Sequence, residues 1–178
     1  MKKTLIISSS PRKHGNSDTL CDVFATTAKE KGHQVEKVFL KDYDIHYCTG
    51  CGYCQTHHGH CSQKDDALKI VSKMVEADVI VLATPVYFYS MSAQLKTLID
   101  RTCPLYTDIT NKDFYIITTA ADSDITEVRR VEDAIGGFIA CLDDVRVKEV
   151  IHALGVYDYN EVNNSQYIEQ IKSIVNNI

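Results

Sequence analysis

The chain has 178 residues, of which 44% are hydrophobic, and one domain with one substantial core is the expected organisation at this length. Its formal net charge is -5 and its Lys and Arg residues are scattered, so the sequence lacks the basic stripe that a nucleic-acid backbone requires. Because no apolar run is long enough to cross a bilayer, we expect a soluble, cytoplasmic protein with neither nucleic-acid nor membrane partners.

Short apolar runs alternate with amphipathic segments along the chain. The apolar runs predict strands at residues 4–8, 35–40, 79–83, 114–119 and 145–151. Apolar residues at three- and four-residue spacing predict helices at 18–31, 67–76, 92–101, 126–142 and 165–175. Strict alternation predicts a three-layer α/β sandwich around a five-stranded parallel sheet, and we expect the strand order 2-1-3-4-5.

The connection between the second strand and the second helix is too long for an ordinary strand-to-helix loop. It covers about residues 41–64 and holds four of the seven cysteines. Long loops in compact domains usually carry a function. We therefore expect one domain over residues 1–178, with a cysteine-rich loop inserted at about 41–64.

Residues 8–17, which read SSSPRKHGNS, follow a predicted strand and precede a predicted helix. Backbone N–H groups and the positive end of the helix dipole meet at such a loop, so its geometry suits an anion. Arg12 adds a fork of donors, and Gly15 lets the backbone fold around a phosphate. The alternative is a helix cap formed by Asn16 or Ser17. The sequence lacks both GxGxxG and the Gly-Lys-Ser/Thr of a nucleoside triphosphate loop.

Three segments together resemble the flavodoxin-like, NAD(P)H-dependent FMN reductase family. Residues 8–17 are similar to its S-x-R-x-x-G-N-S/T phosphate loop, 84–88 (TPVYF) to its loop against the flavin ring, and 92–101 to its next helix. The resemblance implies a flavodoxin-like fold, bound FMN and NAD(P)H as co-substrate. It also implies phosphate contacts from Ser10, Arg12, Asn16 and Ser17, and ring contacts from Pro85, Val86, Tyr87 and Phe88.

The residues after the third and fourth strands add to this interpretation. Aromatic and apolar side chains at 85–88 would form a dry ledge for a flat ring, although they could instead cover the core or contact another subunit. The third flavin loop, residues 118–124, departs from the family because it carries Asp122 and Asp124 where family members often have glycine. No catalytic side chain is expected, since the flavin performs the hard step.

Four cysteines form a compact cluster, C-x2-C-x2-C-x6-C, at Cys48, Cys51, Cys54 and Cys61. Four thiolates at such spacing can hold a [4Fe-4S] cluster, and the motif resembles that of the iron-sulfur flavoproteins in the same family. Zinc is an alternative, because His57, His58 and His60 lie in the same loop, and a metal-free loop is another. Cys21, Cys103 and Cys141 are expected to be buried packing residues.

These features predict an FMN-dependent oxidoreductase that receives electrons from NAD(P)H or a protein donor and passes them through the cluster. The alternatives are a metal-free NAD(P)H-dependent FMN or quinone reductase and a zinc-stabilised binding module. The resemblance further implies a homodimer or homotetramer and a small-molecule or protein redox partner. Asp65 and Asp66 are expected to be acids at the start of a helix, where the dipole favours them.

Overall fold

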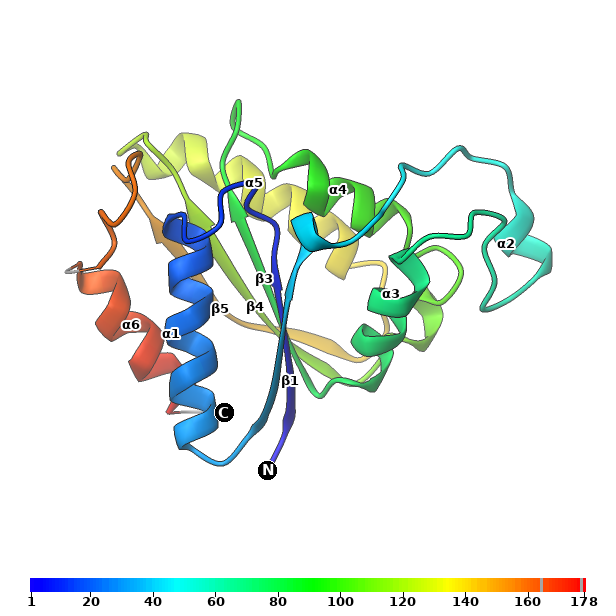
Figure 1. The fold of residues 1–178 in the computed structure, drawn as a ribbon, viewed down its shortest axis with the longest axis horizontal. Helices are drawn as coiled ribbons and strands as arrows, with labels where there is room; N and C mark the ends of the chain where they lie inside the picture. Colours follow the sequence, from blue (N-terminus) through cyan, green and yellow to red (C-terminus); the bar gives the residue numbers. More distant parts are fainter. Residues whose placement is uncertain (164, 177) are drawn as a thin grey trace.

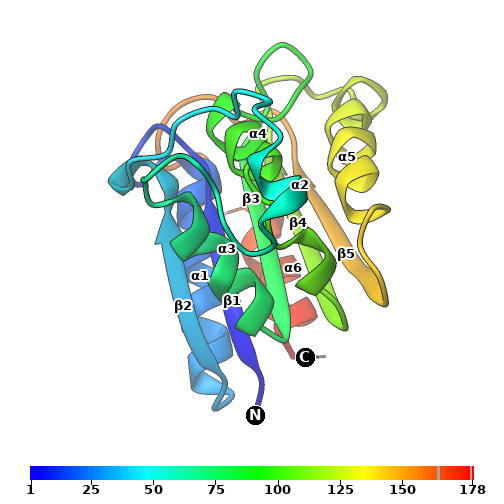
Figure 2. The ribbon, with the colours of Figure 1, turned by 90° about the vertical axis from the view of Figure 1, so that its right-hand side faces the viewer.

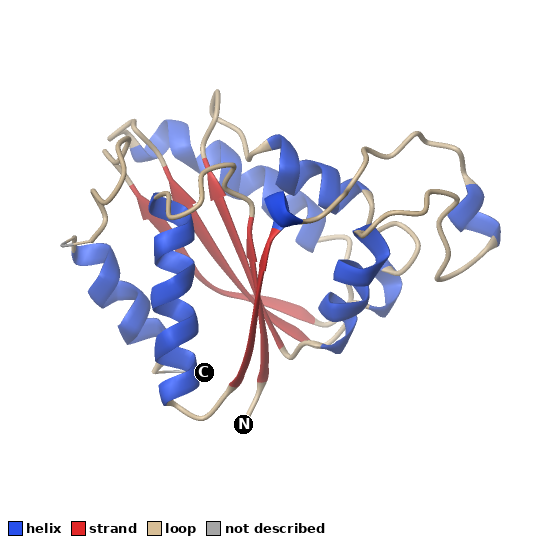
Figure 3. Ribbon diagram, in the orientation of Figure 1, coloured by secondary structure: helices blue, strands red, loops and turns tan. Residues whose placement is uncertain are grey.

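The computed structural model describes residues 1–163, 165–176 and 178. Its five strands form one parallel sheet of order β2-β1-β3-β4-β5, as predicted (Figures 1 and 3). The strands are β1 (Lys3–Ser8), β2 (Gln34–Phe39), β3 (Val79–Pro85), β4 (Lys112–Thr119) and β5 (Val145–Ala153).

The predicted helices are all present with small shifts at their ends. They are α1 (Asn16–Glu30), α3 (Ala67–Glu76), α4 (Ala93–Asp100), α5 (Ile125–Ile139) and α6 (Gln166–Val175). Three short elements were not predicted, namely η1 (Leu40–Asp42), α2 (Tyr53–Thr56) and η2 (Tyr106–Asp108). None of the helices in the described part of the chain has the length and apolar character needed to cross a membrane.

Helices cover both faces of the sheet and give two separate cores (Figures 1 and 2). Leu5 and Ile7 of β1 pack with residues of α3, α4 and α5, whereas Ile6 packs with residues of α1 and α6. This alternation follows from the two-residue period of a strand. Strand β3 is buried at every residue, as predicted for a central strand with helices on both sides.

The strand order reverses between β1 and β3. The chain leaves β1 toward β2 on one side, and after β2 it crosses to β3 on the other side of β1. The loops at the carboxyl ends of these two neighbouring strands therefore diverge and leave a crevice, the usual ligand position in an open α/β sheet.

The connection between β2 and α3 projects away from the sheet, with α2 near its far end (Figure 1). We call residues 43–66 the cysteine arm. Gly50 and Gly52 of the arm have φ values of 65° and 71°, which glycine adopts without steric cost, and α2 begins directly after Gly52. The base of the arm is closed by Asp66, whose N–H donates to Asp44 O at 2.8 Å.

Candidate functional site

The loop between β1 and α1 is held in place while the start of α1 stays uncapped. The backbone N–H and the hydroxyl of Ser9 both donate to Ala83 O of β3, at 3.0 and 2.8 Å. Gly15 is the N-cap residue of α1, and no side chain caps this end. The alternative in which Asn16 or Ser17 caps α1 is therefore not observed. The N–H groups of the first turn and the positive end of the dipole are left to an anion.

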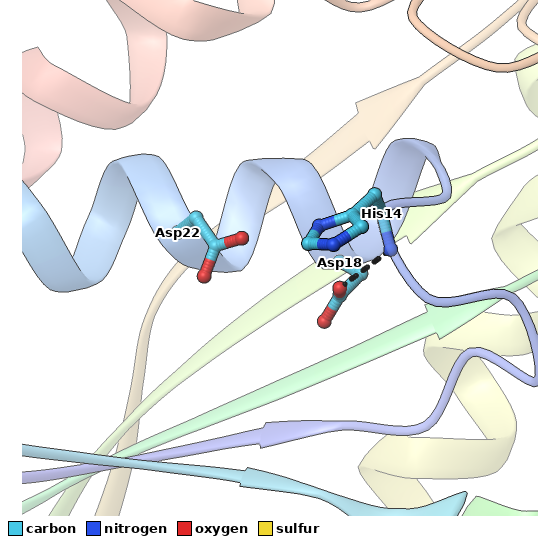
Figure 4. A group of neighbouring side chains, drawn as sticks. All are labelled: His14, Asp18 and Asp22. Atoms are coloured by element: carbon cyan, nitrogen blue, oxygen red, sulfur yellow. Dashed lines mark hydrogen bonds between the residues drawn. The ribbon is translucent and has the colours of Figure 1, made fainter.

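Asp18, in the first turn of α1, braces this loop from inside. Its carboxylate accepts a hydrogen bond from Ser8 Oγ at 2.7 Å. It also accepts one from the backbone N–H of His14 at 2.9 Å, which Figure 4 shows. Lys37 Nζ lies 2.7 Å from Asp18 Oδ1 and 2.6 Å from Asp22 Oδ1. Burial acts to raise the pKa of Asp18, but the hydrogen bonds from Lys37, Ser8 and His14 outweigh it and lower that pKa.

The same side chains bear on the possibility of a metal ion. His14, Asp18 and Asp22 place three potential ligand atoms within 4.8 Å of one another. The Lys37 ammonium already contacts both carboxylates, so a cation is present where a metal would be expected. We assign these acids to the support of the loop and not to a metal site.

Two buried polar atoms at the start of α1 have no partner within the described residues. They are Ser17 Oγ, in a side chain only 1% exposed, and Asn16 Oδ1. An unsatisfied buried polar group costs roughly 1–3 kcal/mol, so such atoms usually face a ligand or water. A Cβ on Gly15 would lie 3.1 Å from both Cβ and O of Arg12, which leaves room for little more than glycine. The donors, the helix dipole and the close backbone fit a phosphomonoester.

One cavity of about 110 Å³ joins this loop to the loops that follow β3, β4 and β5. It contains all the predicted FMN contacts except Phe88. Its lining residues are Ser10, Arg12, Gly15, Asn16, Ser17, Pro85, Val86, Tyr87, Thr119, Ala121, Val156 and Tyr157. Cavities that enclose a small molecule usually measure about 300–1,000 Å³. This cavity can take the phosphate end of FMN, but it is too small to enclose the ring as well.

The loop after β3 ends in a tight aromatic turn. Tyr87 and Ser90 exchange backbone hydrogen bonds of 2.9 and 3.0 Å. Phe88 and Tyr89 between them have φ values of 49° and 59°, a region that bulky residues rarely occupy outside functional sites. The Phe88 side chain is fully exposed and lies outside the cavity that Val86 and Tyr87 line. Its predicted contact with a flavin ring stays a prediction.

The loop after β4 belongs to the same cavity, and its acids have local roles. Asp122 Oδ1 accepts from the N–H of Asp124 at 2.9 Å, and Asp124 Oδ1 caps α5 by accepting from the N–H of Thr126 at 2.8 Å. The small side chains of Thr119 and Ala121 line the cavity instead. Asp124 thus serves as the cap of α5, and Asp122 bonds the backbone of Asp124.

A segment after β5, which the sequence analysis did not identify, completes the site. Arg12 Nη1 donates to Tyr157 O at 3.1 Å, and its guanidinium carbon lies 5.6 and 5.8 Å from the ring centroids of Tyr157 and Tyr159. Asn16 Nδ2 donates to Asp158 O at 2.9 Å. The available signal was the position of this segment directly after the fifth strand, at the edge of the sheet where the other loops meet.

The predicted metal ligands Cys48, Cys51, Cys54 and Cys61 line a second cavity, of about 120 Å³, together with Cys103. Cys103 Sγ lies 3.5 Å from Cys54 Sγ. The hydrogen bond with Cys54, followed by burial, raises the pKa of Cys103, whereas the hydrogen bond with Ser62 lowers the pKa of Cys51. The structure therefore gathers a fifth thiol that the motif did not include.

The expectation that Cys21, Cys103 and Cys141 are buried packing residues was right only for Cys21. Cys103 and Cys141 are exposed. Both follow the ends of their helices, because α4 ends at Asp100 and α5 at Ile139. Residues beyond a helix end lose the periodic contact with the core that the prediction assumed.

Within the described residues, the second cavity does not bring three ligand atoms as close together as a single zinc ion requires. Zinc–sulfur bonds of about 2.3 Å place tetrahedral ligands within about 4 Å of one another. Within the described residues, only His14, Asp18 and Asp22 bring three potential ligand atoms within 4.8 Å. Among the described residues that line the cysteine cavity there is no histidine. His57 stacks on Tyr53 with ring centroids 4.0 Å apart, and His58 Nε2 lies 3.0 Å from Asp108 Oδ2.

Known proteins resemble this chain in sequence and in fold. An iron-sulfur flavoprotein of Archaeoglobus fulgidus is 48% identical over 99 residues, which cover 56% of this chain and 48% of that protein. Another, from Methanocaldococcus jannaschii, is 43% identical over 103 residues, covering 58% and 53%. The chain spans about half the length of these curated relatives. The crystal structure of an azoreductase from Bacillus anthracis shares the fold, with a TM-score of 0.74, 17% identity and complete coverage of both chains.

The family model described as NADPH-dependent FMN reductase matches residues 2–132. These residues include the uncapped loop after β1, the aromatic turn after β3 and the cysteine arm. The resemblance to this family and to its iron-sulfur flavoproteins is therefore confirmed. With its five-stranded sheet and its cavity at the carboxyl ends of the strands, the chain belongs to the NADPH-dependent FMN reductase family.

Proposed function

We propose that this protein is an FMN-dependent oxidoreductase that takes electrons from NAD(P)H or a protein donor and passes them on through a [4Fe-4S] cluster. The whole chain, residues 1–178, acts as one FMN-binding domain that carries the cysteine arm. The observation that carries the flavin part is the buried, unpartnered hydroxyl of Ser17 at an uncapped helix start. Membership of the family supports the same assignment.

The residues of the first cavity would divide the work of binding FMN. Ser17 donates its hydroxyl to the phosphate, and the first-turn N–H groups of α1 add their dipole. Asn16 already donates to Asp158 O, so its unpartnered Oδ1 would accept from a hydroxyl of the ribityl chain. Ser10 shapes the loop, because its Oγ donates to Arg12 O at 2.9 Å. Arg12 contributes positive charge at the cavity wall.

The ring would lie against the loop after β3, where Pro85, Val86 and Tyr87 offer an apolar edge to the cavity. Bound FMN supplies the group that accepts and releases electrons. The protein would hold the phosphate at the loop between β1 and α1, and it would leave the ring accessible to a second reactant. We infer that Phe88, which is fully exposed, contacts the ring when FMN is bound.

Cys48, Cys51, Cys54 and Cys61 would hold the cluster. They fit because they share one cavity with a buried cation, Arg101, and because thiolates spread around a cavity suit a cluster with several irons. The cluster supplies one-electron transfer when it is bound. The names of the relatives support this assignment, since several are iron-sulfur flavoproteins.

The test of the flavin part compares FMN with riboflavin, which lacks the phosphate. Flavin fluorescence titrations of the apoprotein should show much tighter binding of FMN. The double substitution Arg12→Ala, Asn16→Ala should weaken FMN binding more than riboflavin binding, because Arg12 lies at the phosphate site whereas Asn16 would contact a ribityl hydroxyl that both flavins carry. Equal affinities of the unaltered apoprotein for FMN and riboflavin would refute the phosphate site at the start of α1.

The test of the cluster is anaerobic purification followed by an absorption spectrum and assays of iron, acid-labile sulfide and zinc. Stoichiometric iron and sulfide with a broad absorption shoulder beside the flavin bands would support the proposal. Replacement of Cys48 and Cys51 by Ser should abolish the iron, whereas Cys141→Ser is a matched control outside the cavity and should not.

A second candidate function keeps FMN and omits the metal, giving an NAD(P)H-dependent FMN or quinone reductase. It is favoured by the separation of the two cavities, because none of the residues that the structure describes lines both of them. If the anaerobically purified protein shows flavin absorption bands but contains neither iron nor zinc, the metal-free reductase is the correct function.

We also infer a homo-oligomer, dimer or tetramer. Support comes from the exposed aromatic turn at Tyr87, Phe88 and Tyr89, which is a large apolar feature for a monomer surface. Sedimentation equilibrium of the native protein tests it, and a monomeric mass at all concentrations would contradict it.

A further inference from the structure

Arg101, the residue after α4, is the buried cation of the cysteine cavity. It is 2% exposed and is the only basic side chain lining the cysteine cavity in the described part of the chain. Its Nη1 donates to Asp65 Oδ2 and to His46 O, both at 2.6 Å, and its Nη2 donates to Asp65 Oδ1 at 2.8 Å. The two side chains form a bidentate pair, which fixes the plane of the guanidinium.

The same guanidinium also contacts a predicted cluster ligand. Arg101 Nη2 lies 3.4 Å from Cys61 Sγ, within hydrogen-bond range for sulfur. Its Nε is buried and has no partner within the described residues. A buried guanidinium with an unused donor is costly unless a further acceptor comes within reach. Within the described residues, Arg101 thus has one donor left for a further acceptor, in addition to its contact with Cys61.

The pairing with Asp65 explains the position of Arg101, but Arg101 also makes contacts beyond this pair. The Asp65 carboxylate also accepts from the N–H of His46 at 3.0 Å and from the N–H of Ala67 at 3.1 Å, so it joins the arm to the start of α3. Asp65 is thus the helix-start acid predicted from the sequence and also an anchor for Arg101. Asp65 holds the guanidinium so that its Nη2 contacts Cys61 Sγ.

We propose that Arg101 is a positioning residue for the cluster: it holds Cys61 in its ligating place and stabilises the cluster's negative charge. The inference rests on the proposed function, because it requires a cluster at the cysteines. Reduction adds an electron to an already anionic assembly of thiolates, sulfide and iron. A neighbouring cation and a hydrogen bond to a ligand sulfur favour the reduced form, so Arg101 raises the reduction potential.

A merely structural role makes a different prediction. If Arg101 serves only to pair with Asp65 and tie the arm to α4, its replacement changes stability and leaves the potential of the bound cluster as it was. Lysine separates the two roles, because one ammonium can keep the charge opposite Asp65 but lacks the planar fork that reaches Asp65 and Cys61 together.

The experiment uses the anaerobically purified, cluster-loaded protein and its Arg101→Lys variant. Iron and sulfide assays and circular dichroism establish loading and folding, and a redox titration followed by electron paramagnetic resonance gives the midpoint potential. We expect a midpoint more negative than that of the unaltered protein. Arg146→Lys is the matched control, since Arg146 pairs with Asp113 at 3.0 Å and neither residue lines the cysteine cavity. Its midpoint should be unchanged.

A second measurement needs no variant. Protein labelled with ¹⁵N-arginine should show hyperfine coupling between guanidinium nitrogen and the reduced cluster, because Arg101 is the arginine that lines the cavity. Should the lysine variant fail to fold, this coupling decides the question. A loaded, folded variant with an unshifted midpoint, or labelled protein without coupling, overturns the role of Arg101 while the cluster itself stands. Unaltered protein without iron overturns the cluster and the inference together.

Discussion

Replacement of Ser17 by alanine should leave the apoprotein as stable as before or make it more stable, and it should weaken FMN binding. Ser17 Oγ is buried and has no partner within the described residues. Its removal takes away a desolvation cost of roughly 1–3 kcal/mol, so the free energy of unfolding of the apoprotein should stay the same or rise by up to that amount. Packing loss is small, because only one oxygen atom disappears.

FMN affinity should change in the opposite direction. A hydrogen bond to a charged acceptor contributes roughly 1.5–3 kcal/mol. At about 1.4 kcal/mol per tenfold change, the dissociation constant for FMN should rise roughly 10- to 150-fold. Riboflavin, which lacks the phosphate, should bind the variant and the unaltered protein alike.

Two assays on the same preparations check this pair of effects, urea unfolding of the apoprotein and flavin fluorescence titration. Thr27→Ala is the matched control, because Thr27 is also on α1 but its hydroxyl donates to Val23 O at 2.9 Å. That variant should lose stability and keep its FMN affinity. A Ser17→Ala protein that is clearly less stable, or that binds FMN as before, would refute the role given to this hydroxyl.

Three further predictions concern titratable groups. Asp18→Asn should weaken FMN binding in fluorescence titrations, because the amide loses the charge that holds Lys37 and braces the loop; unchanged affinity would contradict this. Arg101 and the hydrogen bonds around Asp65 overcome burial and lower the pKa of that carboxyl to about 2, so its stabilisation is complete above the unfolded pKa near 4 and is lost as the pH falls toward 2. The pH dependence of urea unfolding should be flatter in this range for Asp65→Asn. Burial raises the pKa of Cys21 to about 12, so Cys21→Ser should not change the number of thiols that react quickly with a disulfide reagent at neutral pH.

Several features of the site could be predicted from local sequence. The loop at 8–17 and the ledge at 85–88 were both predicted from the sequence, and of their predicted contacts all but Phe88 line one cavity. They could be found because each directly follows a predicted strand, and the carboxyl ends of parallel strands share one edge of the sheet. The contribution of Val156 and Tyr157 was missed, although it obeys the same rule, because their segment carries no motif.

The contact of Cys103 with the cysteine arm could not be predicted from local sequence. The spacing of Cys48, Cys51, Cys54 and Cys61 predicted one shared site, and the four do line one cavity. Cys103 comes from the end of another helix, and its approach to Cys54 depends on how the arm folds back on α4. Spacing along the chain contains no information on that approach.

By itself, the sequence predicted the class of fold, because alternating strand and helix periodicities indicate a parallel sheet covered by helices on both faces, and the expected strand order is the one observed. Only the tertiary structure decided which polar atoms are satisfied. Ser17 is left without a partner while Arg101 acquires Asp65 and Cys61 from the arm. Arg101 lies far along the chain from Asp65 and Cys61, and these residues meet only because whole helices and loops pack against one another. A local sequence pattern contains no information on that packing.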